Sequence, residues 1–254
     1  MKRSLYIACS VALMMLIACK SHYTVGSISR SRIVIDNRYD RQPDNEAAAF
    51  LVPYKHQVDS MMGPVLGEVA CYMDAKRPES KLSNLLPDIL VAMSGEYGEK
   101  PDFGVYNIGG IRAALVEGKV TYGNVLDVAP FENKICFITL TGEKVLELFQ
   151  QMAARGGECV SHGVELVISS SGKLLSASLN GKQIDPQGKY RITTIDYVAQ
   201  GNDGMTAFKD GTDLNAPKET ESNSRFVIAE YFRRMAASRK VVDAKVEGRI
   251  TVKD

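Results

Sequence analysis

The chain has 254 residues, of which 45% are hydrophobic and 24% are charged, a composition that is ordinary for a globular protein. Its formal net charge of +1 excludes a broadly basic nucleic-acid-binding surface and the acidic excess of disordered chains. The length suffices for one large domain or two small ones, with a core that needs no disulfide bonds.

The N-terminus has the pattern of a signal peptide, in which Lys2 and Arg3 precede a short apolar run. Residues 16–19, Leu-Ile-Ala-Cys, resemble a bacterial lipobox, whose cysteine carries lipid and becomes the first residue of the mature protein. We therefore expect residues 1–18 to be a lipoprotein signal peptide and Cys19 to anchor the chain in the cell envelope. Lys20 rather than Asp follows the cysteine, which favours the outer membrane. The alternative is a signal peptide with an incidental cysteine.

Three other cysteines remain once Cys9 leaves with the signal peptide: Cys71, Cys136 and Cys159. They permit at most one disulfide bond, and the sequence has no Cys-x-x-Cys pair for zinc or redox chemistry. We expect all three to be buried structural thiols.

The predicted elements begin after a polar tether over residues 19–43. A helix over 44–62 is expected to be interrupted or kinked near Pro53. A second helix is predicted over 82–93, where Leu85, Ile89 and Met93 recur at helical spacing. A short strand over 103–107 and a short helix or turn over 121–130 follow.

The best-defined helix follows a strand over 134–140. Thr141 can cap this helix, Val145, Phe149 and Met152 form one apolar stripe, and Gly156 ends it. Further strands are predicted over 163–170, 174–184 with an Asn-Gly hairpin turn, 189–199 and 247–254, and a helix is predicted over 224–238. This mixture predicts an α+β (mixed α/β) domain over 44–254, with mixed β-sheets flanked by helices.

Three loops carry residues suited to a small ligand: Asn107–Arg112, Pro130–Asn133 and Asp196–Gly204. Taken alone, the first is more simply an ordinary strand-to-helix turn with a surface arginine, and a loop aromatic is usually a lid over a local cluster. Together they offer two aromatic rings, Phe131 and Tyr197, for a flat base, and a carboxylate, Asp203, for sugar hydroxyls. Arginine and asparagine side chains suit phosphate and polar edges.

Residues 106–134, YNIGGIRAALVEGKVTYGNVLDVAPFENK, closely resemble the Asn-x-Gly-Gly-Ile-Arg … Pro-Phe-x-Asn block of the C-terminal domain of 5'-nucleotidases. Further matches follow in order, in the segments LTGEKVLELF, YRITTIDYVAQGNDGM and VEGRI, and upstream in ESKLSNLLPDIL. The resemblance runs from about residue 44 to the C-terminus. It implies the fold of that domain and the binding of a nucleotide or nucleoside.

The resemblance implies a role for each matching residue. Phe131 and Tyr197 would clamp the base between two rings, and Asp203 would bind the ribose hydroxyls. The residues implied to contact the base or the phosphate are Asn107, Arg112, Asn133 and Gly156. The upstream phosphate-binding arginine of the family is not matched, because Arg77 lies one position away, so Arg77 is a weaker candidate.

The chain departs from the family pattern at three other positions: Ser83 and Asn202 each replace a glycine, and Met205 replaces an aromatic residue. The change at Asn202 is mild, because asparagine tolerates left-handed conformations. These departures leave open the alternative that the chain is a scaffold that has kept the fold but lost its ligand.

The dimetal phosphatase domain that precedes this domain in the family has no counterpart in the sequence. Such a site needs many His, Asp and Asn ligands, whereas this chain has three histidines, His22, His56 and His162, none near another. We therefore expect no metal, no cofactor and no catalytic residue in this chain, and no phosphatase activity from it alone.

The function implied is the nucleotide-binding half of a split 5'-nucleotidase, whose divalent metals belong to a separately encoded metallophosphatase chain. The alternative is a surface lipoprotein that binds nucleosides or nucleotides without turnover.

Overall fold

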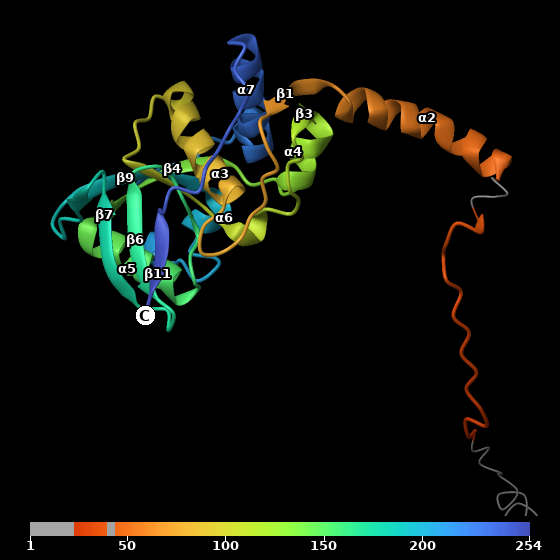
Figure 1. Cartoon of the computed structure of the whole chain (residues 1–254), viewed down its shortest axis with the longest axis horizontal. Helices are drawn as coiled ribbons and strands as arrows, with labels where there is room; N and C mark the ends of the chain where they lie inside the picture. The colour runs from red at the N-terminus through yellow and green to blue at the C-terminus, as the bar shows by residue number, and fades with distance from the viewer. Residues whose placement is uncertain (1–22, 40–43) are drawn as a thin grey trace, which may run out of the picture. The chain divides into compact units, whose positions relative to one another are not determined.

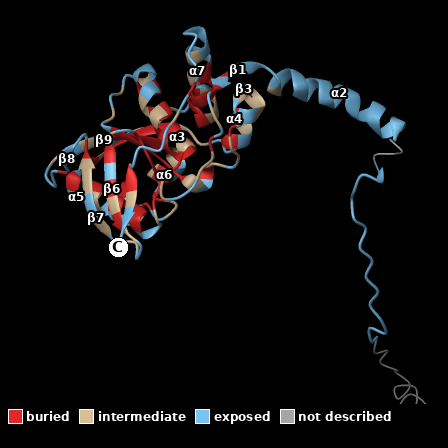
Figure 2. Cartoon of the chain, viewed as in Figure 1, coloured by how far each residue is buried: buried red, intermediate tan, exposed pale blue. Residues whose placement is uncertain are grey.

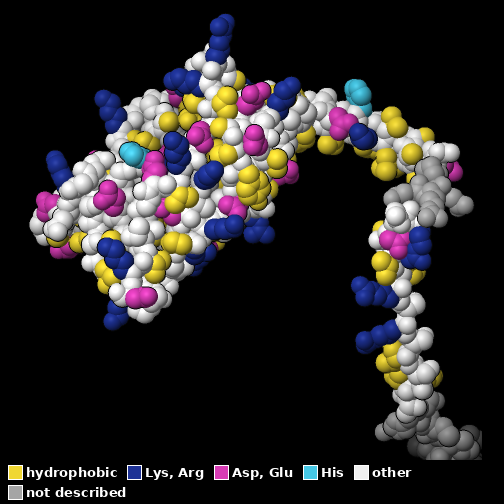
Figure 3. Space-filling model, in the orientation of Figure 1, with side chains coloured by type: hydrophobic (Ala, Val, Ile, Leu, Met, Phe, Trp, Pro, Cys, Tyr) yellow, Lys and Arg dark blue, Asp and Glu magenta, His cyan; other side chains and the backbone are white. Residues whose placement is uncertain are grey.

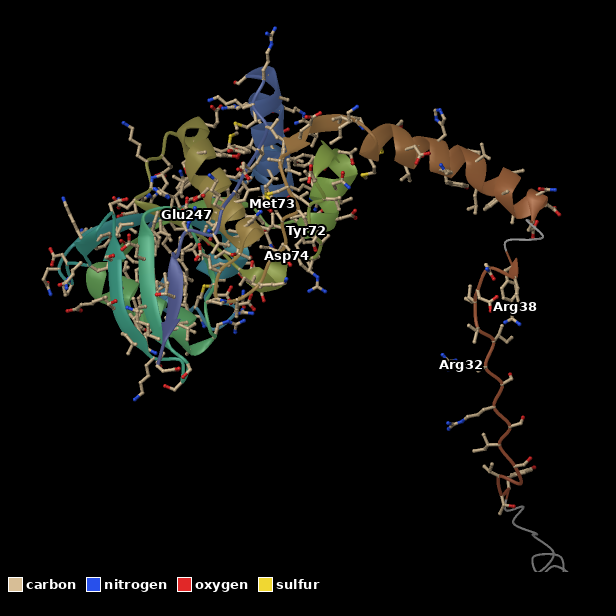
Figure 4. All side chains as sticks on the ribbon, in the orientation of Figure 1. Arg32, Arg38, Tyr72, Met73, Asp74 and Glu247 are labelled. Carbon is tan, nitrogen blue, oxygen red and sulfur yellow. The ribbon has the colours of Figure 1, made fainter. Side chains whose placement is uncertain are left out.

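The computed structural model describes residues 23–39 and 44–254, so the predicted signal peptide and the lipidation of Cys19 lie outside the described residues. Contacts divide the chain into two units, one ending at Phe50 and one from Leu51 to Asp254. In the first unit, residues 23–36 have no regular secondary structure, and Arg38, labelled in Figure 4, forms an ion pair with Asp36 at 2.8 Å. No described helix is long and apolar enough to span a membrane.

Helix α2 (Asn45–Met62) forms where the first helix is predicted, but it is not interrupted at Pro53, which lies inside it. Its N-terminus is capped by Asp44, whose carboxylate accepts a hydrogen bond from the backbone N–H of Ala47 at 2.9 Å. No residue of this helix is buried, which Figure 2 shows as a continuous pale blue ribbon.

The centre of the second unit is a five-stranded sheet with the order β10-β4-β9-β2-β5. Its strands are β10 (Thr212–Asn215), β4 (Ile135–Thr141), β9 (Lys189–Ile195), β2 (Phe103–Tyr106) and β5 (Cys159–Val160). Strands β2 and β9 are parallel, with Phe103 opposite Ile192, while the other neighbouring pairs are antiparallel. The sheet is therefore mixed, as the sequence predicts.

Helices α3 (Lys81–Met93) and α5 (Gly142–Ala154) cover opposite faces of this sheet. The ring of Phe103 on β2 packs on Phe149 of α5, with ring centroids 5.6 Å apart. The next residue, Gly104, faces α3 so closely that a Cβ there would lie 2.7 Å from the Pro87 carbonyl oxygen. Since successive strand residues point to opposite faces, the two helices sandwich the sheet.

Helix α5 forms as predicted. The Thr141 hydroxyl accepts a hydrogen bond from the Lys144 N–H at 3.4 Å, and Val145, Phe149 and Met152 are fully buried. Gly156, just beyond the helix, has a φ of +79°, a conformation that favours glycine.

A four-stranded sheet contains β11 (Ile250–Lys253), β6 (Val164–Ser169), β7 (Leu174–Leu179) and β8 (Lys182–Gln183) in that order. The predicted hairpin joins β7 and β8, and its turn residues Asn180 and Gly181 have φ values of 52° and 74°. Two positive φ values are what a type I′ turn requires.

A two-stranded sheet of β1 (Val65–Val69) and β3 (Gly118–Thr121) packs with α4 (Tyr122–Val128) and α7 (Ser224–Ala237), as Figure 1 shows. The sequence predicts both helices but neither strand. Gly67 interrupts the apolar pattern of β1 because α7 lies very close there: a Cβ would be 3.0 Å from the Phe232 carbonyl oxygen.

Two predictions about the second unit are corrected. The strand predicted over 189–199 ends at Ile195, and its last four residues form the short helix α6 (Asp196–Ala199). Cys136 and Cys159 are buried free thiols as expected, but Cys71 is only half-buried and lies 3.0 Å from Nζ of Lys81.

Candidate functional site

The three predicted loops meet at one edge of the five-stranded sheet. Because β2 and β9 are parallel, the segments that follow both strands emerge at the same edge. Strand β4 is antiparallel to β9, with Ile135 opposite Ile195, so the loop that enters β4 reaches that edge too. The sheet topology therefore brings residues 107–112, 130–134 and 196–204 together.

The first loop turns sharply through the 3₁₀ helix η3 (Ile108–Gly110). The Gly110 N–H donates to the Asn107 carbonyl oxygen at 3.1 Å. Gly110 must lack a side chain, because a Cβ would lie 2.5 Å from Oδ1 of Asn107, which is itself 97% buried. The glycine pair thus lets the Asn107 side chain lie under the turn.

The second loop is held from behind by the start of α7. The carbonyl oxygen of Asn133 accepts a hydrogen bond from the Ser224 N–H at 2.7 Å, and Lys134 forms a β-bridge with Asn223. Phe131 lies at the tip of this loop with 47% of its surface exposed.

The third loop begins with α6. The Asp196 carboxylate accepts hydrogen bonds from the backbone N–H groups of Lys134 at 3.1 Å and Tyr197 at 2.8 Å, which ties this loop to the second. Asn202 donates from its side-chain amide to the Tyr197 carbonyl oxygen at 2.8 Å. Asp203 has a φ of 53°, a strained value for a residue other than glycine.

These loops enclose one cavity of about 180 Å³, lined by Asn107, Gly109, Gly110, Phe131, Asn133, Tyr197 and Asp203. The Asn107 side-chain amide donates to Oδ2 of Asp203 at 2.6 Å, while its own Oδ1 is buried and has no hydrogen-bond partner among the described residues. Five predicted residues therefore line the cavity. Two aromatic rings, one carboxylate and two amides suit a ligand with a flat ring and hydroxyl groups.

Three other predicted residues do not line the cavity. Arg112 is exposed at the end of the first loop, and its Nη1 lies 3.4 Å from the Gly109 carbonyl oxygen. Arg77 donates from Nε to the Gly157 carbonyl oxygen at 2.8 Å. A Cβ at Gly156 would lie 3.8 Å from Cδ of Arg77, so these two residues are neighbours.

Next to the first loop, Glu158 forms a buried ionic centre that the sequence does not predict. Its side chain has no exposed surface, and its Oε1 accepts hydrogen bonds from Nη2 of Arg77 and, at 2.9 Å, from Nε of Arg155. Its Oε2 accepts one from the Ile108 N–H at 2.8 Å. The available signal is the position of this glutamate between a glycine pair and the apolar Cys-Val of β5. A carboxylate in such a position is buried, and carboxylates are rarely buried unless they are paired.

A larger groove of about 530 Å³ lies elsewhere, along η2 (Ser94–Tyr97), η5 (Thr220–Ser222) and α7. It contains none of the predicted residues. Its two arginines are already paired, Arg233 with Glu230 and Arg234 with Glu96 and Glu230. The smaller cavity is the better candidate because its polar groups converge. On the face in Figure 3, basic and acidic side chains are interspersed.

No group of three or more His, Cys, Asp or Glu side chains in residues 23–39 and 44–254 could hold a metal ion. His162 instead places Nδ1 3.0 Å from Oε2 of Glu247, which Figure 4 labels ahead of β11. The described residues therefore do not fit a dimetal centre of the kind that the resemblance implies for the phosphatase domain.

Comparison with known proteins gives several matches. A family model described as "5'-nucleotidase, C-terminal domain" matches residues 65–210. The 5'-nucleotidase of Vibrio vulnificus is 26% identical over 186 residues, 69% of this chain and 34% of that protein. Protein UshA of Escherichia coli is 27% identical over 166 residues, 63% of this chain and 30% of UshA.

Among solved structures, the 5'-nucleotidase precursor from Thermus thermophilus has a TM-score of 0.71 at 24% identity. The match covers 83% of this chain and 44% of that one, and it shows a shared fold. The aligned part spans about a third of the length of the two curated relatives.

Proposed function

The chain belongs to the family of 5'-nucleotidase C-terminal domains, and we propose that it binds a nucleotide or nucleoside in the cavity between its three loops. One observation carries the proposal: Asn107, Phe131, Asn133, Tyr197 and Asp203, spread over three loops, line a single cavity. The mixed-sheet fold and its structural neighbour agree with the family.

Each lining residue has a proposed role that follows from its chemistry. Phe131 and Tyr197, which are 47% and 38% exposed, have ring surface available to stack on a base. Stacking of this kind contributes about 1–3 kcal/mol per base in nucleic-acid binders. Asp203 would accept hydrogen bonds from the ribose hydroxyls, and Asn107 would hold the Asp203 carboxylate in place through its 2.6 Å hydrogen bond to Oδ2.

Arg112 is the proposed phosphate contact. It is exposed at the first loop, and its guanidinium makes one long hydrogen bond, at 3.4 Å, to the Gly109 carbonyl oxygen. Most of its donors therefore remain available to a phosphate. Arg77 is a poorer candidate for this role, because Nε and Nη2 are already bonded to Gly157 and Glu158.

We propose further that the chain contributes substrate recognition to nucleotide hydrolysis, and that a separately encoded metallophosphatase chain performs the chemistry. The described residues hold no candidate metal site, whereas hydrolysis by this family's chemistry requires a two-metal clamp. A lipid on Cys19 would keep the pair at the membrane of the cell envelope, most simply the outer membrane.

The test is a reconstitution of AMP hydrolysis. A candidate partner, a separately encoded metallophosphatase chain, is assayed with AMP, alone and with the full-length chain in detergent. The proposal expects kcat/KM to rise with the wild-type chain and to rise far less with Phe131→Ala or Asp203→Ala. AMP binding without any effect on hydrolysis would instead favour the nucleotide-binding lipoprotein that acts without turnover.

A further inference from the structure

Arg155, the residue that follows α5, places its guanidinium beside the carboxylate of Asp203. Its Nη2 lies 4.0 Å from Oδ1 of Asp203, and 36% of its side-chain surface is exposed. Only Nε is committed, through its 2.9 Å hydrogen bond to Glu158. Neither Nη1 nor Nη2 has a hydrogen-bond acceptor within the part of the chain that the structure describes.

Two neighbours, Glu158 and Gly204, border this guanidinium. Glu158 is fully buried and holds Nε of Arg155 from below. Gly204, with a φ of +73°, lies beside it, since a Cβ there would be in ordinary van der Waals contact with Cδ and Nη1, at 3.8 Å from each. The hydrogen bond to Glu158 therefore holds the guanidinium beside Asp203, with its open N–H groups near the cavity that Asp203 lines.

Asp203 offers its two oxygens unequally. Oδ2 already accepts the 2.6 Å hydrogen bond from Asn107, whereas Oδ1 is the oxygen that faces Arg155. A hydroxyl that donates its proton to Oδ1 would lie between a carboxylate and a guanidinium. It could then accept a hydrogen bond from Arg155 with its oxygen lone pairs while it donates to Asp203.

We propose that Arg155 is a specificity-determining residue that, with Asp203, selects ligands with an intact ribose cis-diol. Asp203 takes the protons of the diol and Arg155 donates to its oxygens. The chain is thereby specific for ribonucleosides and ribonucleotides over deoxy analogues. This inference rests on the proposed function, because it requires a nucleoside in the cavity.

The test measures how strongly Arg155 and the diol are coupled. Adenosine, 2′-deoxyadenosine and 3′-deoxyadenosine are titrated by calorimetry into the full-length chain in detergent, as wild type, Arg155→Gln and Arg155→Lys. A hydrogen bond to a charged group changes affinity by about 10- to 100-fold. The wild-type preference for adenosine over at least one deoxy analogue should therefore shrink by about tenfold in Arg155→Gln.

Arg155→Lys keeps the positive charge beside Glu158 but loses the planar guanidinium. It should also reduce the preference for adenosine over the deoxy analogue, by a smaller factor than Arg155→Gln does. It provides the test if Arg155→Gln does not fold. Arg239→Gln is the matched control, since Arg239 lies at the end of α7 and has no ion pair among the described residues. This variant should keep the wild-type preference.

The outcomes separate the two claims. If the arginine variants weaken adenosine and both deoxy analogues equally, Arg155 does not read the diol and this inference is wrong, while the nucleoside site stands. If the wild-type chain binds none of the three nucleosides, the proposed function fails and the inference fails with it.

Discussion

The buried carboxylate of Glu158 should be a major stabilising group, and Glu158→Gln tests this. The side chain is completely buried and accepts hydrogen bonds from Arg77, from Arg155 and from the Ile108 N–H. A glutamine has the same shape but only one acceptor oxygen. Its amide N–H₂ would therefore point at another donor, either at the two guanidiniums or at the Ile108 N–H.

The expected loss follows from these contacts. One buried donor left unsatisfied costs about 1–3 kcal/mol, and the charge-assisted bonds add to this. The guanidiniums are 33% and 36% exposed, so water partly replaces their lost partner. We therefore expect Glu158→Gln to lower the free energy of unfolding by about 2–4 kcal/mol.

The assay is urea unfolding followed by circular dichroism, with the midpoint and slope fitted for each variant. Glu147→Gln is the matched control, because Glu147 is 43% exposed on α5 and its ion pair with Lys144 should contribute less than about 1 kcal/mol. Equal small losses for both variants would refute the reasoning. The three hydrogen bonds that Glu158 accepts would then contribute no more to stability than one exposed ion pair.

Three further predictions concern pH, the first loop and metals. Burial raises the pKa of Cys136 and that of Tyr106 to about 12, so the folded state retains protons that the unfolded state loses. The free energy of unfolding should be constant below about pH 9 and fall towards pH 12, by up to about 1.4 kcal/mol per pH unit for each group. Thermal unfolding measured from pH 8 to 11 should show this fall, and Cys136→Ala should make it less steep. Gly110→Ala should lower the free energy of unfolding in urea by about 1–3 kcal/mol, because its Cβ would lie 2.5 Å from Oδ1 of Asn107. Gly109→Ala should lower it much less, because its Cβ would lie 3.5 Å from Oδ2 of Asp203. Equal losses for the two variants would contradict the geometry. EDTA should leave adenosine binding unchanged in calorimetry, since the described residues hold no candidate metal site, and a marked loss would reveal a missed ion.

Local signals in the sequence predict much of the fold correctly. The Asn180-Gly181 turn has the two positive φ values that its residues favour, and Thr141 caps α5 where the apolar stripe begins. Strand β1 could not be predicted in this way. Gly67 weakens its strand pattern, and the reason for the glycine is the close approach of Phe232, a residue 165 positions further along the chain.

The same limit applies to the site. The resemblance finds the residues that line the cavity because they occur in short motifs, each within one loop. The ionic centre joins Glu158 to Arg77 and to the Ile108 N–H, which are 81 and 50 residues away. Such a contact depends on tertiary packing, so no local pattern could reveal that Arg77 turns towards Glu158 or that Arg155 faces Asp203.

The most direct test of the nucleoside site is calorimetric titration of adenosine into the full-length chain in detergent, without added metal. Phe131→Ala is compared with Tyr72→Ala, which removes a similarly exposed aromatic ring, labelled in Figure 4, that does not line the cavity. The account predicts that the wild-type chain and Tyr72→Ala bind alike and that Phe131→Ala binds about 5- to 150-fold more weakly. Adenosine binding that Phe131→Ala leaves unchanged, or no binding by the wild-type chain, would contradict it.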